Sequence, residues 1–307
     1  MKPEEIQNQR ILFSALNWGM GHVSRSIPII HQLKNQDNIL FIACSSAQQK
    51  IFEAYFDNLN FIHHEDYPFR FNGRGNFSFD LLLSLPQLSK RLFQEKKEVE
   101  NLINKYQIDV CISDHRYGFY SNNITSIFIT HQVQIALPKQ LNWLNYPHHR
   151  LMKKFNFIWV LDDEKSKIAG KLSLNNDFKE LHYIGIQSRF SLYPLLDKED
   201  YTVVIVSGPS PYIEQFFEAE LKKAKKSKTK THFISTKIKY YEKDIPNQVI
   251  IHHNLNWRES DEIILKAKKV ISRSGYSTIM DIHFLKCESV LSPTKGQYEQ
   301  EYLAKIH

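Results

Sequence analysis

The chain of 307 residues contains only three cysteines, and no apolar run approaches the roughly 18 residues that would cross a bilayer. Cys44, Cys111 and Cys287 are scattered, each in or beside an apolar run, which favours buried thiols in a reducing compartment. The first five residues are polar and lack the apolar segment of a signal peptide. We therefore expect a cytoplasmic protein without a disulfide framework.

Motifs that define several common enzyme classes are also missing. No G-x-x-x-x-G-K-[ST] and no G-x-S-x-G is present, which argues against a P-loop nucleotidase and a serine hydrolase. Cys-x-x-Cys is absent, and the histidine pairs at 63–64, 148–149 and 252–253 lack the spacing of metal ligands. We expect neither a metal ion nor another cofactor.

The glycine turn at 17–22, Asn-Trp-Gly-Met-Gly-His, superficially matches the first half of a dinucleotide fingerprint. A nicotinamide site also needs an acidic residue at the end of the second strand, where this chain has Ala-Cys-Ser-Ser at 43–46. This absence argues against NAD. Two interpretations of the turn remain, a tight strand-to-helix connection and a close approach to some other ligand.

The net charge of +7 and the pI near 9.0 leave three kinds of partner open: nucleic acid, an anionic membrane surface and an anionic small substrate. The densest basic run, 222–230, lies at the end of an expected helix, where exposed cations complement the helix dipole. No zinc finger, RRM signature or basic–aromatic alternation is present. We expect no nucleic acid partner.

Short apolar runs rich in Ile, Val and Phe alternate with helical segments, which predicts an α/β fold with parallel sheets and right-handed crossovers. The strands are expected at 10–15, 39–44, 61–64, 110–113, 127–130, 158–161, 202–206, 231–235, 249–252, 269–272 and 289–292. A helix is expected at 24–34, after the first glycine turn. The stretch 79–106 is expected to be mostly helical, with a break at Pro86.

A polar, proline-punctuated stretch between Tyr183 and Tyr201 predicts a domain boundary, after which the β–α alternation restarts. We expect an N-terminal domain over 1–190 and a C-terminal domain over 200–307. The second domain would normally continue for another strand or helix, so its C-terminus is expected to be shortened.

The most informative segment is 271–281, Ile-Ser-Arg-Ser-Gly-Tyr-Ser-Thr-Ile-Met-Asp. It predicts the end of a buried strand, a Ser/Gly turn and the first turns of a helix. Such a junction points backbone N–H groups outward at the positive end of the helix dipole, which suits a phosphate or diphosphate. Asp281, two turns later, could accept hydrogen bonds from a ribose. Together with the first glycine turn, the segment suggests a ligand held between two α/β domains.

Three polar strand ends outline a candidate site in the first domain. His22 ends the glycine turn, where an imidazole is suited to act as a general base. Asp114 and Arg116 follow one expected strand and His131 follows the next, and ligands of open α/β sheets bind at the carboxyl ends of strands. Asp114 and Arg116 could instead pair with each other and shape their loop, and His131 could be structural.

In the order of these features the chain resembles a GT-B glycosyltransferase, most closely the MurG-like branch, which transfers a sugar from a UDP-sugar. The resemblance covers nearly the whole chain. It is strongest over 273–281 and 293–303 and vague over 66–104. It implies two Rossmann-like, doubly wound domains that face a cleft, with the N-terminal domain on the acceptor side and the C-terminal domain binding the nucleotide sugar.

The resemblance also implies roles for individual residues. His22 matches the histidine of the family's Gly-Gly-His motif and would be the catalytic base. Asp114, Arg116 and His131, at the polar strand ends, remain acceptor-side candidates on their position alone. The implied donor contacts are Gly19, Gly21, Ser207, Gly208, Arg273, Ser274, Gly275, Asp281, Gln297, Gln300 and Glu301. Asp281 stands where the family has a longer Glu. At 300–304 the chain reads Gln-Glu-Tyr-Leu-Ala instead of Gln-Gln-x-x-Asn, which puts GlcNAc in doubt as the donor sugar.

We therefore expect an inverting, metal-independent glycosyltransferase that moves a sugar from a UDP-sugar to an unidentified acceptor, lipid-linked or glycan. A helix N-terminus with Ser, Gly and Arg donors can replace a metal in stabilising the leaving diphosphate. Two alternatives stay open: a UDP-sugar 2-epimerase of the same architecture, and a nucleotide-sugar-binding protein without catalysis.

The leucine-rich segment 77–93, with Lys90 and Arg91 near its end, lies where such enzymes meet a lipid-linked acceptor. An amphipathic, basic edge there would give peripheral contact with an anionic membrane at its inner face. An ordinary core helix fits the same pattern better.

Overall fold

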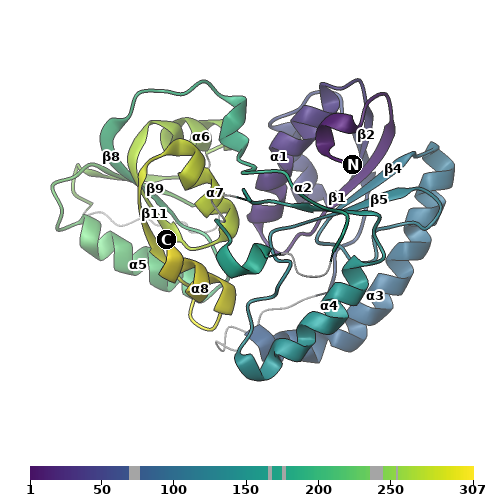
Figure 1. The fold of residues 1–307 in the computed structure, drawn as a ribbon. Coiled ribbons are helices and arrows are strands. Elements are labelled where there is room, and N and C mark those ends of the chain that lie inside the picture. The colour runs from purple at the N-terminus through teal and green to yellow at the C-terminus, as the bar shows by residue number, and fades with distance from the viewer. Residues whose placement is uncertain (69–76, 165–167, 175–177, 236–244, 254) are drawn as a thin grey trace. The chain divides into compact units, whose positions relative to one another are not determined.

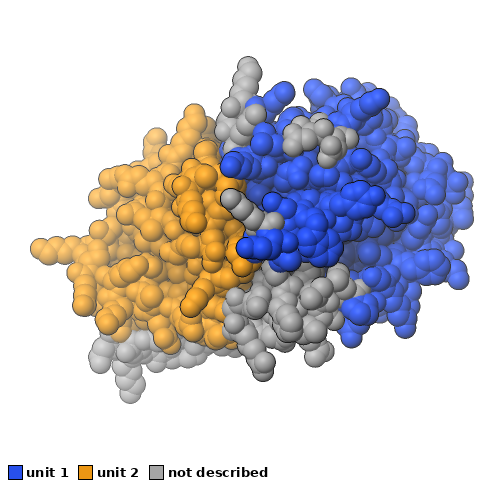
Figure 2. All heavy atoms as spheres, turned by 60° about the horizontal axis from the view of Figure 1, so that its bottom comes forward, with its two compact units in different colours: residues 1–70, 78–189 blue, residues 71–77, 190–307 orange. Residues whose placement is uncertain are grey.

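The computed structural model describes residues 1–307 except 69–76, 165–167, 175–177, 236–244 and 254, and it describes the backbone alone at 77–83, 85 and 139. The chain forms two compact units, unit 1 (1–70 and 78–189) and unit 2 (71–77 and 190–307), which are coloured separately in Figure 2. Each unit contains one parallel sheet with helices packed on it (Figure 1). The expected α/β class with two Rossmann-like sheets is confirmed.

Unit 1 is built on a seven-stranded sheet with the order β3-β2-β1-β4-β5-β6-β7. Its strands are β1 (Arg10–Ala15), β2 (Ile39–Cys44), β3 (Asn60–His63), β4 (Val110–Asp114), β5 (Thr125–Thr130), β6 (Phe157–Val160) and β7 (Leu181–Tyr183). Its helices are α1 (Met20–Lys34), α2 (Ser46–Glu53), α3 (Phe77–Tyr106) and α4 (Asn145–Met152). Short 3-10 turns lie at Pro3–Glu5, Lys139–Leu144 and Gly170–Ser173, and another, Arg189–Leu192, begins at the last residue of unit 1.

The strands of this sheet are all parallel, but the side on which successive strands are added changes once. From β1 the chain moves outward to β2 and β3, and it then returns through α3 to β4 on the other side of β1. Because parallel crossovers are right-handed, α1 and α3 cover opposite faces of the sheet. The carboxyl ends of β1 and β4 therefore form the switch point of unit 1, the place where open α/β sheets bind ligands.

Unit 2 repeats this design on a smaller scale. Its sheet has the order β10-β9-β8-β11-β12. The strands are β8 (Glu199–Ile205), β9 (Thr231–Ile234), β10 (Val249–His252), β11 (Ala267–Arg273) and β12 (Glu288–Ser292), and the helices are α5 (Tyr212–Ala224), α6 (Trp257–Lys266), α7 (Tyr276–Leu285) and α8 (Tyr298–Ile306). The switch point here lies between β8 and β11.

Two separate apolar clusters in unit 2 follow from that topology. One contains Phe216 and Phe217 of α5, packed with Phe233 of β9. The other contains Ile264 of α6 and Ile282 of α7. Opposite crossover directions place α5 on one face of the sheet and α6 with α7 on the other, so each face has its own core.

Two local expectations were wrong. The helix after the glycine turn begins at Met20 rather than at 24, because Gly19 adopts φ +129° and turns the chain directly into α1. The helix α3 runs from Phe77 to Tyr106 without ending at Pro86. Burial of Leu88 and Val99 on that helix shows tertiary packing on the C-terminal side of the proline, which outweighs the local cost.

The segment 77–93 mixes buried and exposed positions. The side chains of 77–83 and 85 lie outside the described residues, whereas Leu88 is buried and Phe93 is 77% exposed. Within the described part of the chain, no helix is long and apolar enough to span a membrane.

Candidate functional site

Unit 1 gathers ionisable side chains at its switch point. His22 lies in the first turn of α1, directly after the glycine turn that follows β1. Asp114 is the last residue of β4, and His131 follows β5. Because β1, β4 and β5 are neighbours in register, their carboxyl ends lie at one edge of the sheet. The structure therefore brings His22, Asp114 and His131 into one cluster.

Arg25 joins these three residues into a hydrogen-bonded network. Its Nε donates to Asp114 Oδ2 at 2.8 Å, and its Nη2 donates to Asp114 Oδ1. Nη2 also lies 2.8 Å from His22 Nδ1, and Nη1 lies 3.0 Å from His131 Nδ1. His22 Nδ1 is in addition 3.1 Å from Asp114 Oδ1. The guanidinium of Arg25 thus donates two hydrogen bonds to the Asp114 carboxylate and contacts the imidazoles of His22 and His131.

Burial sets the charges in this network. Asp114 is fully buried and Arg25 is 2% exposed, whereas the side chain of His22 keeps 18% exposure. Burial opposes ionisation of Asp114, but the charges of Arg25 and then His22 hold its pKa well below the ordinary value. Burial lowers the pKa of His22, and the positive charge of Arg25 lowers it further against the opposing pull of Asp114. His22 is therefore neutral near pH 7 and able to exchange a proton.

Aromatic and imidazole rings surround His22. The ring of His115 lies 5.8 Å from that of His22 and 5.7 Å from that of Tyr117, centroid to centroid. The Tyr117 hydroxyl is 2.8 Å from His148 Nδ1, and burial lowers the pKa of His148 to about 4. His115 adopts φ +63° directly after Asp114, and its Nδ1 is buried without a partner among the described residues. The neighbours of His22 are therefore mostly neutral rings.

Arg116 points away from this cluster. Its fully buried guanidinium bonds Glu95 of α3 at 2.7 Å and Asp66 at 2.9 Å. Glu95 also bonds His64 and the Tyr67 hydroxyl. The alternative in which Asp114 and Arg116 pair with each other is wrong, because each carries its own partners. Arg116 ties α3 and the chain after β3 to the end of β4.

Sequence reasoning did not select Arg25, His115, Tyr117 or His148. A signal for Arg25 was present, because residues three apart on a helix share a face and Arg25 follows His22 by three positions. His148 belongs to a histidine pair whose spacing does not suit metal ligands, and its sequence carries no other functional signal. Its approach to Tyr117 depends on the position of α4, which local sequence does not indicate.

Unit 2 presents backbone instead of charge at its switch point. The turn Ser207–Gly208 follows β8, and Ser274–Gly275 follows β11, the strand paired with β8. Gly275 is the N-cap of α7 and has no side chain to cap the helix. A Cβ added at Gly208 or Gly275 would meet no atom within 4 Å. The two glycines therefore border open space beside a helix N-terminus.

The side chains of Arg273 and Ser274 are both engaged inside unit 2. Arg273 donates to the carbonyls of Tyr212, at 2.7 Å, and Pro293, at 3.0 Å, and its guanidinium lies over the Phe216 ring. Ser274 is fully buried and donates to the carbonyl of Gln300 at 2.8 Å. These contacts hold the start of α5 and the segment before α8 against the β11 turn.

The segment after β12 folds back on itself in a similar way. Gln300 Oε1 accepts from the Thr294 N–H and Glu301 Oε1 accepts from the Gly296 N–H, both at 2.9 Å. Gln297 is the N-cap residue of α8. Two buried polar atoms of this region, Arg273 Nε and Thr294 Oγ1, have no partner within the described part of the chain. Asp281 lies in the second turn of α7 and is 7% exposed.

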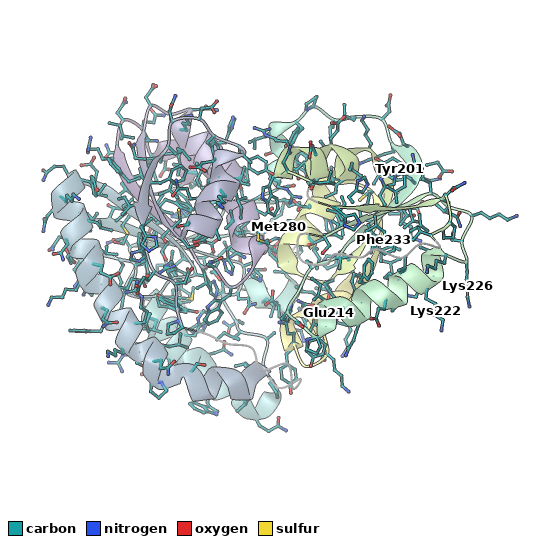
Figure 3. All side chains as sticks on the ribbon, turned by 180° about the vertical axis from the view of Figure 1, so that it is seen from behind. Tyr201, Glu214, Lys222, Lys226, Phe233 and Met280 are labelled. Carbon is teal, nitrogen blue, oxygen red and sulfur yellow. The ribbon has the colours of Figure 1, made fainter. Side chains whose placement is uncertain are left out.

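The basic run of 222–230 lies at the opposite edge of unit 2. The helix α5 begins near the carboxyl ends of the strands and runs back along the sheet, so its last turn is remote from the turn at Gly208. Lys222 and Lys226 point outward there, away from the core residue Phe233 (Figure 3). Cations at a helix C-terminus complement its dipole. The run does not belong to the candidate site.

The chemical capacity of the two edges differs. Unit 1 supplies a neutral imidazole with a buried carboxylate behind it, which suits proton transfer. Unit 2 supplies two glycines and a helix N-terminus, which suits an anionic group. Among the residues that the structure describes, no group of three or more His, Cys, Asp or Glu side chains is arranged to hold a metal ion.

No protein-family model matches this sequence, and no curated protein is similar to it in sequence. Solved structures do match the fold along nearly its whole length. The glycotransferase of kitacinnamycin has a TM-score of 0.68 at 13% identity, covering 97% of this chain and 84% of the other. The spinosyn rhamnosyltransferase SpnG has a TM-score of 0.64 at 11% identity, covering 96% and 83%.

MurG from Acinetobacter baumannii has a TM-score of 0.56 at 10% identity, covering 96% of this chain and 82% of MurG. A further matching structure of SpnG, with a TM-score of 0.62 and 12% identity over 96% of this chain and 83% of the other, is complexed with thymidine diphosphate. Because SpnG and the kitacinnamycin enzyme match at higher TM-scores than MurG, the MurG branch is not singled out. The chain has the GT-B fold of glycosyltransferases.

Proposed function

We propose that this protein is an inverting glycosyltransferase that moves a sugar from a nucleoside-diphosphate sugar to an acceptor hydroxyl. The observation that carries the proposal is the contact between His22 and the buried Asp114 at the switch point of unit 1, in a chain with the GT-B fold. His22 is the partly exposed member of that pair, so its imidazole is the one that a substrate can reach. Asp114 and His131 act through the network and not on the acceptor itself.

The proposed reaction is a direct displacement. His22 removes the proton from the acceptor hydroxyl, whose oxygen then attacks the anomeric carbon of the donor sugar. The bond between that carbon and the diphosphate oxygen breaks, and the configuration at the carbon inverts. The departing diphosphate gains charge, which oriented backbone N–H groups and a helix dipole can stabilise without a metal. The first turn of α7 and the glycines at 208 and 275 are the proposed seat for it.

The side chains of Arg273 and Ser274 have a different role in this proposal from the one that the sequence resemblance implies. Both hold the protein together around the turn. We propose that they shape the diphosphate seat while the backbone beside Gly275 makes the contact. Gln300 and Glu301 likewise fix the segment at 294–296, where the donor sugar is proposed to lie, by accepting from its backbone.

We also propose which nucleoside diphosphate the donor carries, that is, its base and its ribose or deoxyribose. We propose UDP, because a carboxylate at Asp281 could accept hydrogen bonds from both hydroxyls of a ribose. Thymidine diphosphate, found with SpnG, has no 2′-hydroxyl. The discriminating experiment is calorimetry with UDP, dUDP and dTDP, on the wild type and on Asp281→Asn.

A loss of affinity from UDP to dUDP that shrinks in Asp281→Asn supports the ribose contact. Equal affinity for UDP and dUDP, or preference for dTDP, rejects the UDP assignment. The same protein is then incubated with a panel of radiolabelled nucleotide sugars with and without EDTA. Slow release of free sugar with inverted configuration, unaffected by EDTA, supports the transferase. A changed sugar still attached to the nucleotide indicates an epimerase, and binding without turnover indicates a non-catalytic protein.

We also propose that the acceptor is lipid-linked and is met at a membrane surface. Three aromatic side chains of unit 1 are unusually exposed, Phe93 at 77%, Trp143 at 65% and Tyr146 at 74%. Aromatic side chains of this kind favour the interface between water and lipid, and the net charge of +7 favours anionic headgroups. Flotation with vesicles of phosphatidylglycerol should recover the protein, and Phe93→Ser with Trp143→Ser should reduce recovery. Equal recovery of wild type and variant would reject this surface.

A further inference from the structure

Arg25 is a buried side chain with an extensive set of polar contacts. It is 2% exposed, yet three of its nitrogens reach four different atoms: two oxygens of Asp114, Nδ1 of His22 and Nδ1 of His131. A guanidinium carries five N–H donors and no acceptor. Each atom that it bonds must therefore present a lone pair, including the Nδ1 atoms of both histidines.

This requirement conflicts with the other contact of His22. Nδ1 of His22 lies 2.8 Å from Arg25 Nη2 and 3.1 Å from Asp114 Oδ1. If Nδ1 carries the proton, it can donate to Asp114 but cannot accept from Arg25. If Nδ1 is unprotonated, it accepts from Arg25 and the proton of the neutral ring is on Nε2. The two contacts belong to two different tautomers of one imidazole.

We propose that Arg25 is a positioning residue that holds His22 in the tautomer with its proton on Nε2 as long as no substrate is bound. Asp114 already accepts two hydrogen bonds from Arg25, so it does not depend on His22 as a donor. Arg25 itself is buried, and a buried N–H without an acceptor costs more than an optimal bond returns. Nδ1 of His22 accepts a hydrogen bond from Nη2 of Arg25, and Nδ1 of His131 accepts one from Nη1, so both nitrogens have an acceptor.

The other groups around His22 do not counteract this preference. His115, from the segment after β4, faces it with a ring whose pKa burial holds well below the ordinary value. His131, from the segment after β5, touches the opposite side of the guanidinium. Among the described residues, Arg25 and Asp114 are thus the charged groups in contact with His22, and Arg25 stands on the same helix, three residues away.

The consequence for activity rests on the proposed function. Nδ1 of His22 faces the network, so Nε2 is the nitrogen available to an acceptor. With its proton on Nε2, the ring donates a hydrogen bond and cannot remove a proton. Base catalysis needs the other tautomer, with Nδ1–H donating to Asp114. Arg25 therefore restrains the base. Hydrolysis of the donor by water is slow until the ring exchanges protons with solvent, losing the proton on Nε2 and gaining one on Nδ1, which it then donates to Asp114.

The tautomer is measurable without any substrate. In protein labelled with ¹⁵N-histidine, protonated and unprotonated ring nitrogens have well-separated chemical shifts, and His22→Gln assigns the signals. In the wild type at pH 7.5 we expect a proton on Nε2 of His22. In Arg25→Met we expect the proton on Nδ1, hydrogen-bonded to Asp114. Arg91→Met, which removes another buried arginine that bonds Glu98 and not His22, should leave the His22 signals as in the wild type.

A wild-type spectrum with the proton on Nδ1 of His22 overturns the proposal by itself, whether or not Arg25→Met folds. An unchanged tautomer in a folded Arg25→Met also overturns it. Arg25→Lys serves if the methionine variant does not fold, because a single ammonium cannot span all four atoms and should shift the proton toward Nδ1. Donor hydrolysis gives the separate readout, with a several-fold rise expected in the variant. If no variant hydrolyses any donor while the NMR result holds, the proposed function fails and the role of Arg25 stands.

Discussion

The two units place different chemistry at the same topological position. At the switch point of unit 1, the strand ends carry Asp114, His131 and, through α1, His22 and Arg25, and the guanidinium of Arg25 contacts the other three side chains. At the switch point of unit 2, the strand ends carry serines and glycines, and the nearest charged side chain, Arg273, bonds backbone carbonyls. Unit 1 gathers ionisable side chains at this position, and unit 2 exposes backbone beside a helix end.

The energetic consequences also differ. A buried ion pair is costly to break because the remaining charge has no water to solvate it. A substitution in a turn of small residues next to open space changes the free energy of unfolding little. If a ligand binds at that turn, the substitution changes its affinity more than it changes stability. The comparison therefore predicts large effects on turnover and stability in unit 1, and small effects on stability but measurable effects on binding in unit 2.

The largest effect is expected for His22→Asn. If His22 is the base, turnover should fall by about 10²–10⁴, the usual contribution of a general base. Affinity for the nucleotide and the melting temperature should change little, because His22 is partly exposed and the proposed diphosphate seat lies in unit 2. Steady-state donor hydrolysis and calorimetry measure both quantities. Unchanged turnover with weakened nucleotide binding would move His22 to the donor side and break the division between the units.

The next largest effect is expected for Arg116→Met. The change leaves Glu95 buried without its cation, which should lower the free energy of unfolding by about 3–5 kcal/mol. Arg116→Met with Glu95→Gln removes both charges and should recover part of the loss. Urea denaturation followed by circular dichroism gives the comparison. An unchanged unfolding free energy, accompanied by a raised KM for the acceptor, would restore Arg116 as an acceptor contact.

The third prediction concerns pH. Burial lowers the pKa of His148 to about 4, below its ordinary value near 6.5, so the unfolded chain binds this proton more readily than the folded protein. The stability contributed by the neutral ring is therefore complete above pH 6.5 and is lost as pH falls toward 4, by about 3 kcal/mol in all. His148→Gln should flatten this part of the stability curve, measured by urea denaturation at each pH. A curve with the same slope in both proteins would show that His148 is not the group responsible.

The smallest effect on the fold is expected for Gly275→Ala. Its φ of −74° suits any residue, and an added Cβ meets no atom within 4 Å, so stability should change by less than about 0.5 kcal/mol. Nucleotide affinity should fall by about 1 kcal/mol if the methyl group displaces one hydrogen bond to the diphosphate. Gly118→Ala is the contrasting variant in unit 1, because its Cβ would lie 2.6 Å from the Leu92 carbonyl oxygen. It should destabilise the protein by about 1–3 kcal/mol. Unaltered nucleotide affinity in Gly275→Ala would remove the diphosphate from this turn.

The sequence was sufficient for elements whose signal is local and continuous. The expected strands at 10–15 and 39–44 coincide with β1 and β2, because a strand that is buried along nearly its whole length requires consecutive apolar residues. The strand β7 was missed because it has only three residues at the sheet edge, and α4 was missed because its sequence is polar and carries no strong apolar period. The start of α1 was missed because glycines normally indicate a turn.

By itself, the sequence determined which residue types stand at the strand ends: small residues after β8 and β11, and His, Asp and Arg around β1 and β4. Only the tertiary structure decided which of them meet. Arg25 reaches Asp114 across 89 positions of the chain, and Arg273 reaches the Tyr212 carbonyl across 61. An isolated arginine on a helix, such as Arg25, or at the end of a strand, such as Arg273, is normally solvated. What turns these two inward is the crossover topology, which brings distant acceptors to one sheet edge and excludes the water that would otherwise serve each guanidinium.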